Sequence, residues 1–340
     1  MRVRARIDRE ALANNLALLR KLAPASRILA VVKADGYGHG LIHAAQALAT
    51  ADGFGVTSVE EALELRESGF RGTVVVLEGA LAGKELKAAA AARLDLVVHA
   101  DWQLDMLERD GSPANARFWV KFDTGMHRLG FPTATADRVR TRLDAIGAAN
   151  TVLMSHLACA DEPSRPETER QLQAFDRLRG FFPGAASLAN SAGLLAHPAT
   201  HCDWVRPGLA LYGVSPVAGR AAGEFGLRPA MTLTSRILSI REVAAGEAVG
   251  YGAAWRATRA SRIGIVSIGY GDGYPWRSIS TGFALVAGRR IPLAGRVSMD
   301  MLGLDLTELP DVGPGDVVTL WGEGLPVEEV ARAAGTTPYE

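Results

Sequence analysis

The sequence predicts an α/β protein in which an eight-stranded βα barrel of the TIM type is followed by a C-terminal all-β domain. Short apolar runs alternate with segments of helical period from about residue 27 to residue 210, which is typical of repeated βα units around a parallel sheet. After about Glu224 the pattern changes to alternating, strand-rich sequence broken by glycine and proline. A length of 340 residues accommodates a barrel and a second, smaller domain.

The first predicted domain, residues 9–223, is the barrel. Its expected strands are Arg27 to Val32, Phe54 to Ser58, Thr73 to Glu78, Leu94 to His99, Arg117 to Asp123, Val152 to Leu157, Ala186 to Asn190 and Asp203 to Arg206. Helices are expected between them: Ser58 is a suitable cap for VEEALELRESG, Asp101 precedes WQLDMLER, and another helix lies within Arg165 to Phe182.

The second predicted domain, residues 224–340, consists of β-hairpins. Segments such as TLTSRILSI, SRIGIVSIGY and DVVTLWGE alternate apolar and polar residues and are separated by turn residues. The opening segment within residues 1–8, VRARI, has no barrel strand to pair with, so we expect it to join this domain.

Composition and charge exclude several classes of partner. The 37 Lys and Arg residues are balanced by 37 Asp and Glu residues, which leaves no positive surplus for nucleic acid or an anionic membrane. The N-terminus is charged where a signal peptide needs an apolar core, and no segment reaches the ~18 apolar residues of a membrane span. We therefore expect a soluble, cytoplasmic protein. The two cysteines, Cys159 and Cys202, suit neither a disulfide framework nor a metal site.

Lys33 is the first candidate for chemistry. It ends the apolar strand RILAVV and precedes ADGYGHG, a glycine-rich loop that lets the backbone approach a ligand closely. A lysine at the mouth of an apolar barrel loses hydration, its pKa falls, and the free amine can form a Schiff base. A lysine that extends to solvent explains the position equally well.

A second group of candidates follows the last two barrel strands. Asn190 and Ser191 end one strand, and Arg206, Gly208 and Leu209 follow the next, where barrels commonly build a phosphate site. Backbone N–H groups near Gly208 and the Ser191 hydroxyl would cradle a dianion. Taken separately, NSAG is a helix cap and RPG a turn, but their coincidence at one end of the barrel favours a ligand site.

The histidines and tyrosines are less specific. His156 ends a strand, where a structural role is the more common one. His39 and His43 are four residues apart on an expected helix, but no carboxylate or cysteine partner is evident, so we expect no metal. Tyr251 lies in a turn-rich segment, where it caps an edge or, if a cation such as Arg206 faces it, acts as a base.

Seven segments in order resemble a known family. They are AVVKADGYGHG (Ala30 to Gly40), KFDTGMHRLGF (Lys121 to Phe131), SHLACADEP (Ser155 to Pro163), DWVRPGLALYGVSP (Asp203 to Pro216), VGYGAAW, GYGDGYP and GRVSMDM (Gly295 to Met301). Together they resemble the alanine racemases along the whole chain. This resemblance, and not the periodicity, implies pyridoxal 5'-phosphate as the cofactor and alanine as the substrate.

The resemblance implies a two-base mechanism in a homodimer with shared active sites. Lys33 would form the internal aldimine and act as acid and base on one face of the substrate Cα. Tyr251 of the second subunit would act on the other face, because a single base tends to return the proton to the side it left. His156 and Arg206 would line the site and tune Tyr251.

The resemblance also implies binding roles. Arg206 would donate to the pyridine nitrogen and keep the ring a weak electron sink, since a guanidinium stays protonated. Arg128 would lie near the substrate carboxylate, oriented by Lys121, which many members carry in carbamylated form. The phosphate would be held by Tyr37, Ser191, Gly208 and Leu209. Across the dimer interface, Met299 and Asp300 would help bind the substrate.

Other proteins with a related fold offer alternative functions. A broad-specificity or serine racemase would use the same pair of bases, although exported members of the first kind carry a signal sequence. A decarboxylase of basic amino acids pairs the pyridine nitrogen with a carboxylate, which Arg206 argues against. A pyridoxal-phosphate carrier protein consists of a single barrel without the C-terminal β domain. A structural barrel that binds no ligand would leave the position of Lys33 at the end of its strand without an explanation.

The C-terminal strand of the β domain and the metabolic role of the protein are not decided by the residues. Family members usually continue past Tyr339 and Glu340 with a further strand, so we expect the β domain to lack a closing strand. The residues do not decide between supply of D-alanine for peptidoglycan and breakdown of alanine.

Overall fold

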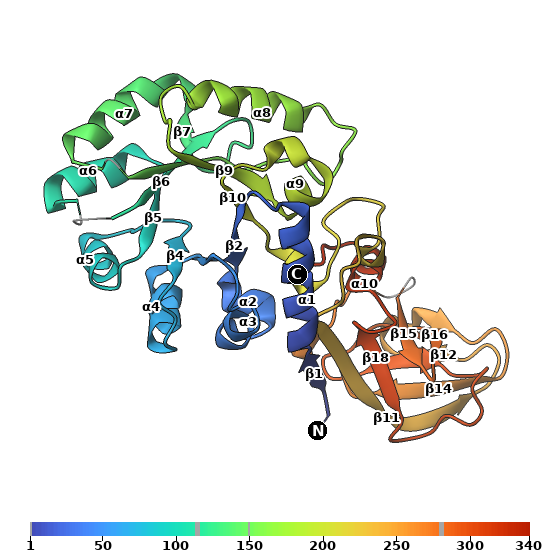
Figure 1. Ribbon diagram of the computed structural model, residues 1–340. Coiled ribbons are helices and arrows are strands. Elements are labelled where there is room, and N and C mark those ends of the chain that lie inside the picture. The colour runs from blue at the N-terminus through green and yellow to red at the C-terminus, as the bar shows by residue number, and fades with distance from the viewer. Residues whose placement is uncertain (1, 113–115, 149, 279–281) are drawn as a thin grey trace. The chain divides into compact units, whose positions relative to one another are not determined.

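The computed structural model describes residues 2–112, 116–148, 150–278 and 282–340 (Figure 1). The chain forms two compact units, one made of Arg9–Arg228 and the other of Met1–Asp8 with Pro229–Glu340. Within the described ranges, no helix has the length and apolar character needed to cross a membrane.

In the first unit, eight parallel strands of the described residues close into a barrel, and β5 pairs with β6 to complete the ring. In the order of the barrel they are β5 (Asp95–Val98), β4 (Thr73–Val76), β3 (Gly53–Val56), β2 (Arg27–Val31), β10 (Trp204–Arg206), β9 (Ala185–Asn190), β8 (Thr151–Met154) and β6 (Phe118–Asp123). The two-residue strand β7 (Phe131–Pro132) pairs with the end of β6. The predicted fold class is confirmed.

Helices connect the barrel strands and lie outside them in Figure 1. They are α1 (Arg9–Leu22), α2 (Lys33–Gly38), α3 (Leu41–Ala47), α4 (Val59–Glu67), α5 (Gly83–Ala91), α6 (Asp101–Asp110), α7 (Ala136–Ala145), α8 (Glu167–Leu178) and α9 (Ser191–Ala196). The Ser58 side chain caps α4 as predicted, whereas α6 begins at Asp101 itself with Ala100 before it. Several strands end earlier than predicted; β3 stops at Val56 because Ser58 is the cap of the next helix.

The barrel strands are short and apolar because both of their faces are buried. Side chains of β2, β4, β5, β6, β8 and β10 meet in one buried cluster: Leu29, Val75, Val97, Trp119, Val152, Met154 and Trp204. This cluster fills the barrel, so polar residues at the strand ends are left to face the openings.

The second unit is an antiparallel sheet in the order β16 (Arg289–Pro292), β15 (Phe283–Val286), β18 (Val317–Trp321), β11 (Met231–Val243), β14 (Ser261–Val266) and β17 (Leu302–Asp305). The N-terminal strand β1 (Arg4–Ile7) pairs with β11. The unit also contains the small pair β12 (Ala248–Val249) and β13 (Trp255–Arg256), and the helix α10 (Val327–Ala334).

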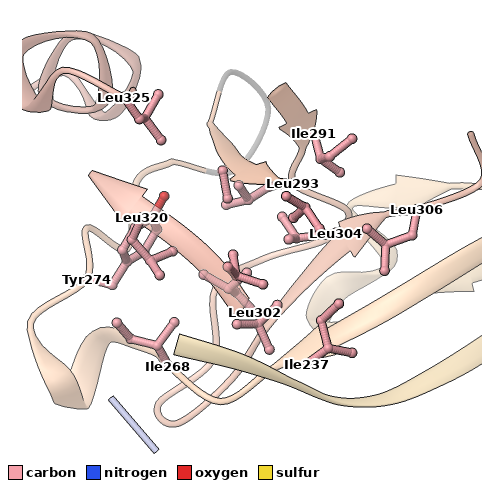
Figure 2. Packing of buried hydrophobic residues seen from close by; sticks show 14 of the residues in the cluster. Ile237, Ile268, Tyr274, Ile291, Leu293, Leu302, Leu304, Leu306, Leu320 and Leu325 are labelled. Atoms are coloured by element: carbon pink, nitrogen blue, oxygen red, sulfur yellow. The ribbon is translucent and has the colours of Figure 1, made fainter. Parts of the chain in front are cut away.

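The long strand β11 organises this unit. Its first half pairs with β1 and β18, and its second half pairs with β14. Irregularities in register near Leu233 and near Ile237 bend the strand, so that one chain segment serves both pairings. Figure 2 shows the apolar core that results, in which Ile237, Ile268, Leu302, Leu304 and Leu320 belong to one buried cluster.

Candidate active site

A left-handed turn follows Lys33. The backbone of Ala34, Asp35, Gly36 and Tyr37 has φ of 52°, 52°, 61° and 54° with ψ between 40° and 56°. Each L-residue in this conformation costs roughly 1–2 kcal/mol, and a run of them is rare. Such strain persists only where the surroundings hold it, and it is concentrated at functional sites.

Glu61 holds the turn in place. Its Oε1 accepts a hydrogen bond from the backbone N–H of Ala34 at 2.7 Å, and its Oε2 accepts one from Thr57 at 2.7 Å. Asp35 closes the other end, since its Oδ1 accepts from the N–H of Leu41 at 2.7 Å. Sequence reasoning missed Glu61 as a site residue. Glu61 comes three residues after the helix cap Ser58, a spacing that is typical of the start of a helix. That spacing does not indicate a contact with the loop after Lys33.

The turn positions Tyr37 beside Gly208. The Tyr37 ring stacks on Tyr212 with centroids 4.7 Å apart, and the Tyr212 hydroxyl donates to the carbonyl of Val31 at 3.2 Å. A Cβ on residue 208 would lie 2.3 Å from Tyr37 Oη. Glycine is therefore required at 208 for the Tyr37 hydroxyl to occupy this position.

The turn also separates two histidines that we expected on one helix, and that expectation is wrong. His39 is the residue after α2, its Nδ1 lies 2.8 Å from the Tyr37 carbonyl oxygen, and its ring packs against Tyr212. His43 lies in α3, which begins after Gly40. Gly40, at φ 88°, breaks the helical path between them.

Ser191 and the segment after β10 meet at the carboxyl ends of the strands. The Ser191 hydroxyl accepts hydrogen bonds from the N–H of Gly208 at 2.9 Å and of Ala210 at 3.3 Å. Asn190 caps α9, because its Oδ1 accepts from the N–H of Gly193 at 2.9 Å. Leu209 is buried next to them. The helix cap expected from NSAG is present, and it brings hydroxyl and N–H groups together.

Arg206 is almost fully buried and is held by oxygen atoms that carry no full charge. Nη1 donates to Ser187 Oγ at 2.5 Å, and Nη2 donates to the carbonyls of Ser155 at 2.5 Å and Leu188 at 3.2 Å. Burial lowers the pKa of Arg206 to about 10, which is still far above neutral, so the guanidinium stays charged.

His156 is held next to Arg206. Its Nδ1 lies 3.4 Å from Arg206 Nη2, and a guanidinium can only donate, so Nδ1 is the acceptor. Its Nε2 lies 3.5 Å from Asn190 Nδ2. Burial, followed by the charges of Arg206 and Lys121, lowers the pKa of His156 well below its ordinary value. The imidazole is therefore neutral at neutral pH.

Lys121 is a buried lysine surrounded mostly by cations. Burial lowers its pKa to about 8, and the charges of Arg206, Arg128 and Lys33 act in the same direction, while Asp123 opposes them. The carboxylate of Asp123 is already used, since Oδ1 accepts from the backbone N–H groups of residues 125, 126 and 127. Lys121 is thus a basic side chain with an unusually large neutral fraction.

The predicted site residues of the first unit form one cluster. Contacts and charges connect Lys33, Tyr37, Lys121, Arg128, His156, Asn190, Ser191, Arg206, Gly208 and Leu209. They lie at or after the carboxyl ends of barrel strands, the face at which barrels of this type bind ligands. Four of these residues are basic, namely Lys33, Lys121, Arg128 and Arg206, so the arrangement suits an anionic ligand.

The other predicted site residues belong to the second unit. Tyr251 begins a short turn between Gly250 and Gly252 and is 72% exposed, which is more than any other large apolar or aromatic side chain among those described. Met299 is exposed as well, and its carbonyl accepts from the N–H of Gly271 at 2.8 Å. The exposed Asp300 lies 3.8 Å from Arg2.

Comparison with known proteins agrees with this geometry. Two families match the chain: "Alanine racemase, N-terminal domain" over residues 7–216 and "Alanine racemase, C-terminal domain" over residues 230–340. The alanine racemase of Shewanella sediminis (strain HAW-EB3) is 49% identical over 339 residues, which is 99% of this chain and 95% of that protein.

Solved structures show the same likeness. The biosynthetic alanine racemase from Pseudomonas aeruginosa has a TM-score of 0.96 and 46% identity, covering 100% of this chain and 95% of that one. The alanine racemase from Bartonella henselae, solved with covalently bound pyridoxal phosphate, has a TM-score of 0.89 and 28% identity over 100% and 96% of the two chains. The chain therefore belongs to the alanine racemase family of pyridoxal-phosphate-dependent isomerases.

Proposed function

We propose that this enzyme interconverts L-alanine and D-alanine, with pyridoxal 5'-phosphate bound covalently at Lys33. The observation that carries the proposal is the cluster of cations at the carboxyl end of the barrel. Lys33 acts electrostatically on both Lys121 and His156, so it lies among Lys121, Arg128 and Arg206. This environment accepts an anionic cofactor and an amino-acid carboxylate.

The residues present fit the cofactor. Its phosphate is a dianion that needs hydrogen-bond donors, and the hydroxyls of Tyr37 and Ser191 both lie beside Gly208. Because Ser191 Oγ accepts from the N–H groups of Gly208 and Ala210, its own proton is left to donate. A Cβ at residue 208 would fill the space that Tyr37 uses. The residues that would hold the phosphate are Tyr37, Ser191, Gly208 and Leu209, and Asn190 would support them by capping the helix that begins at Ser191.

Arg206 would donate to the ring nitrogen of the cofactor. When bound, the cofactor supplies an electron-withdrawing ring that makes the Cα proton of alanine more acidic. The charged guanidinium of Arg206 leaves the ring nitrogen without a proton and so limits this effect. Return of the proton to Cα is then favoured over side reactions such as transamination.

Two residues would move the proton. Lys33 Nζ would take or return it on one face of Cα, and Tyr251 Oη of the partner subunit would do so on the opposite face. The high exposure of Tyr251 in the single chain supports this role, because a side chain that enters another subunit is uncovered without it. Met299 and Asp300, which are also exposed, would approach the substrate from the same partner.

Arg128 would bind the substrate carboxylate. We propose that Lys121 is carbamylated: its neutral amine would attack carbon dioxide and lose a proton, giving an anion that orients Arg128. The pKa of about 8 supports this, because the nucleophilic neutral form is accessible near neutral pH. Carbon-13 NMR after incubation with labelled bicarbonate should show a carbamate resonance that Lys121→Met removes.

The proposal is tested by proton exchange in deuterated water, with each alanine enantiomer supplied separately. Tyr251→Phe should remove Cα exchange from one enantiomer far more than from the other, and Tyr339→Phe, at another exposed tyrosine, should change neither. Equal losses for both enantiomers would refute the two-base scheme. Lys33→Ala should remove the visible absorbance of the bound cofactor, and retention of that absorbance would refute the assignment of Lys33.

Mixing of subunits tests whether active sites are shared. Lys33→Ala and Tyr251→Phe proteins should each be nearly inactive alone. If each site combines Lys33 of one subunit with Tyr251 of the other, random reassociation restores roughly a quarter of the wild-type sites, because half of the dimers are mixed and each has one intact site. No recovery in proven mixed dimers would show that both residues act within one chain.

A further inference from the structure

A cavity lies at the opposite end of the barrel from the proposed active site. Its volume is about 730 Å³, and it lies at the starts of β2, β6, β8, β9 and β10, whereas Lys33, His156 and Arg206 lie at strand ends. We call it the lower cavity. Strands of three to six residues separate the two ends by roughly 10–20 Å. The lower cavity therefore shares no lining residue with the site described above.

Guanidinium groups dominate the wall of the lower cavity. Arg27, Arg117 and Arg140 line it, and no carboxylate of the described residues does. The Trp204 ring forms part of the wall, with the Arg27 guanidinium 5.4 Å and the Arg117 guanidinium 5.7 Å from its centroid. Trp204 is nearly completely buried, and both guanidinium groups lie within cation–π distance of its ring.

The three charges are not equally neutralised. Arg117 forms an ion pair with Asp95 at 2.6 Å, and Arg140 forms one with Asp144, with Nε and Oδ2 2.9 Å apart. The Arg27 side chain has no ion pair or hydrogen bond with any residue that the structure describes. The lower cavity thus presents one uncompensated positive charge and the outer edges of two more guanidinium groups.

Asn150 and Thr151 add polar groups to the wall, and another part of the wall is apolar. Phe181 is 43% exposed, which is high for a large apolar side chain, and it lines the cavity together with Pro183. A volume of this size is within the range of ~300–1,000 Å³ found for small-molecule sites, and a few charged groups beside apolar surface are the usual lining of such sites. Arginine binds phosphate through two parallel N–H donors and stacks on planar rings.

We propose that the lower cavity binds a small organic phosphate that carries an aromatic ring. The phosphate contacts Arg27 and Arg140, and the ring lies against Phe181. The end of the barrel opposite the active site ordinarily contributes stability only, so binding there is an additional property of this enzyme.

The experiment is calorimetric titration of the enzyme saturated with pyridoxal phosphate, using adenosine monophosphate as the probe. Saturation with the cofactor keeps the probe out of the cofactor's own phosphate site. We expect saturable binding of one probe per chain, which weakens as salt is added. Arg27→Gln should weaken binding roughly tenfold or more, because a charge-assisted hydrogen bond is lost.

Matched variants distinguish a built site from general surface charge. Arg140→Gln should also weaken binding, whereas Arg138→Gln, on the same helix but paired with Asp101, should not. The cofactor absorbance should be unchanged in all three. Absence of saturable binding, or equal weakening by Arg138→Gln, would overturn the proposal. Inorganic phosphate that binds as tightly as the nucleotide would overturn the assignment of an organic ligand.

Discussion

An alanine at position 208 would place its Cβ 2.3 Å from Tyr37 Oη and 2.9 Å from Tyr37 Cζ. Non-bonded atoms need roughly 3.5 Å, so the Tyr37 hydroxyl has to move by about 1 Å. Gly208 has φ of −121° and ψ of −88°, and the contact with Tyr37 is the effect that the double-mutant cycle below isolates. The Tyr37 ring is stacked on Tyr212, which restricts how it can give way.

The expected result is weaker binding of pyridoxal phosphate. A hydrogen bond to a charged group contributes about 1.5–3 kcal/mol, so displacement of the Tyr37 hydroxyl from the phosphate should raise the Kd roughly 10- to 150-fold. The measurement is titration of the cofactor-free protein, followed by the absorbance of the lysine-bound cofactor. Gly223→Ala is the matched control, because no atom lies within 4 Å of its Cβ position.

A double-mutant cycle identifies the route of the effect. Tyr37→Phe removes the hydroxyl without adding an atom at position 208. If Gly208→Ala acts through that hydroxyl, the double variant should bind the cofactor little worse than Tyr37→Phe alone. Wild-type affinity of Gly208→Ala, or full additivity in the double variant, would refute the proposed phosphate contact.

Two further predictions concern the charges around the site. Glu61→Gln should lower the free energy of unfolding by about 1 kcal/mol and weaken cofactor binding. The glutamine amide has one oxygen, so it cannot accept from the N–H groups of both Ala34 and Thr57 as the two carboxylate oxygens do. Urea unfolding measures the change in stability, and an equal effect of Glu64→Gln would contradict this reason. Lys121→Met should raise the free energy of unfolding at pH 7 by about 3 kcal/mol. The pKa of Lys121 is about 8 in the folded protein and 10.5 ordinarily, so at pH 7 the protonated amine destabilises the folded state, and methionine removes that charge. The unfolded chain binds more protons between pH 8 and 10.5, so wild-type stability rises relative to the variant across that window. Urea unfolding in buffer free of carbon dioxide at pH 7 and pH 10 checks the sign, and a constant difference would refute it.

The sequence determined the fold class and the end of the barrel at which the candidate site lies. Alternation of apolar strands with helical segments reflects burial, which is a local property of each segment, and the eight strands were found with end shifts of a few residues. Lys33 at the end of β2 and Asn190 at the end of β9 were placed by the same pattern. The chemistry assigned to them came from family resemblance, because strand position alone left Lys33 open to two interpretations.

Only the tertiary structure decided how the site is held. Nothing local predicts a left-handed turn at Ala34 and Tyr37, because L-residues disfavour that conformation and the hydrogen bond that supports Ala34 comes from the distant carboxylate of Glu61. The approach of Tyr37 to Gly208 joins segments far apart in the chain and depends on closure of the barrel. The depressed pKa of Lys121 likewise arises from burial and from cations brought close by packing. Periodicity shows which residues are buried; contacts between distant segments arise only when the chain is folded.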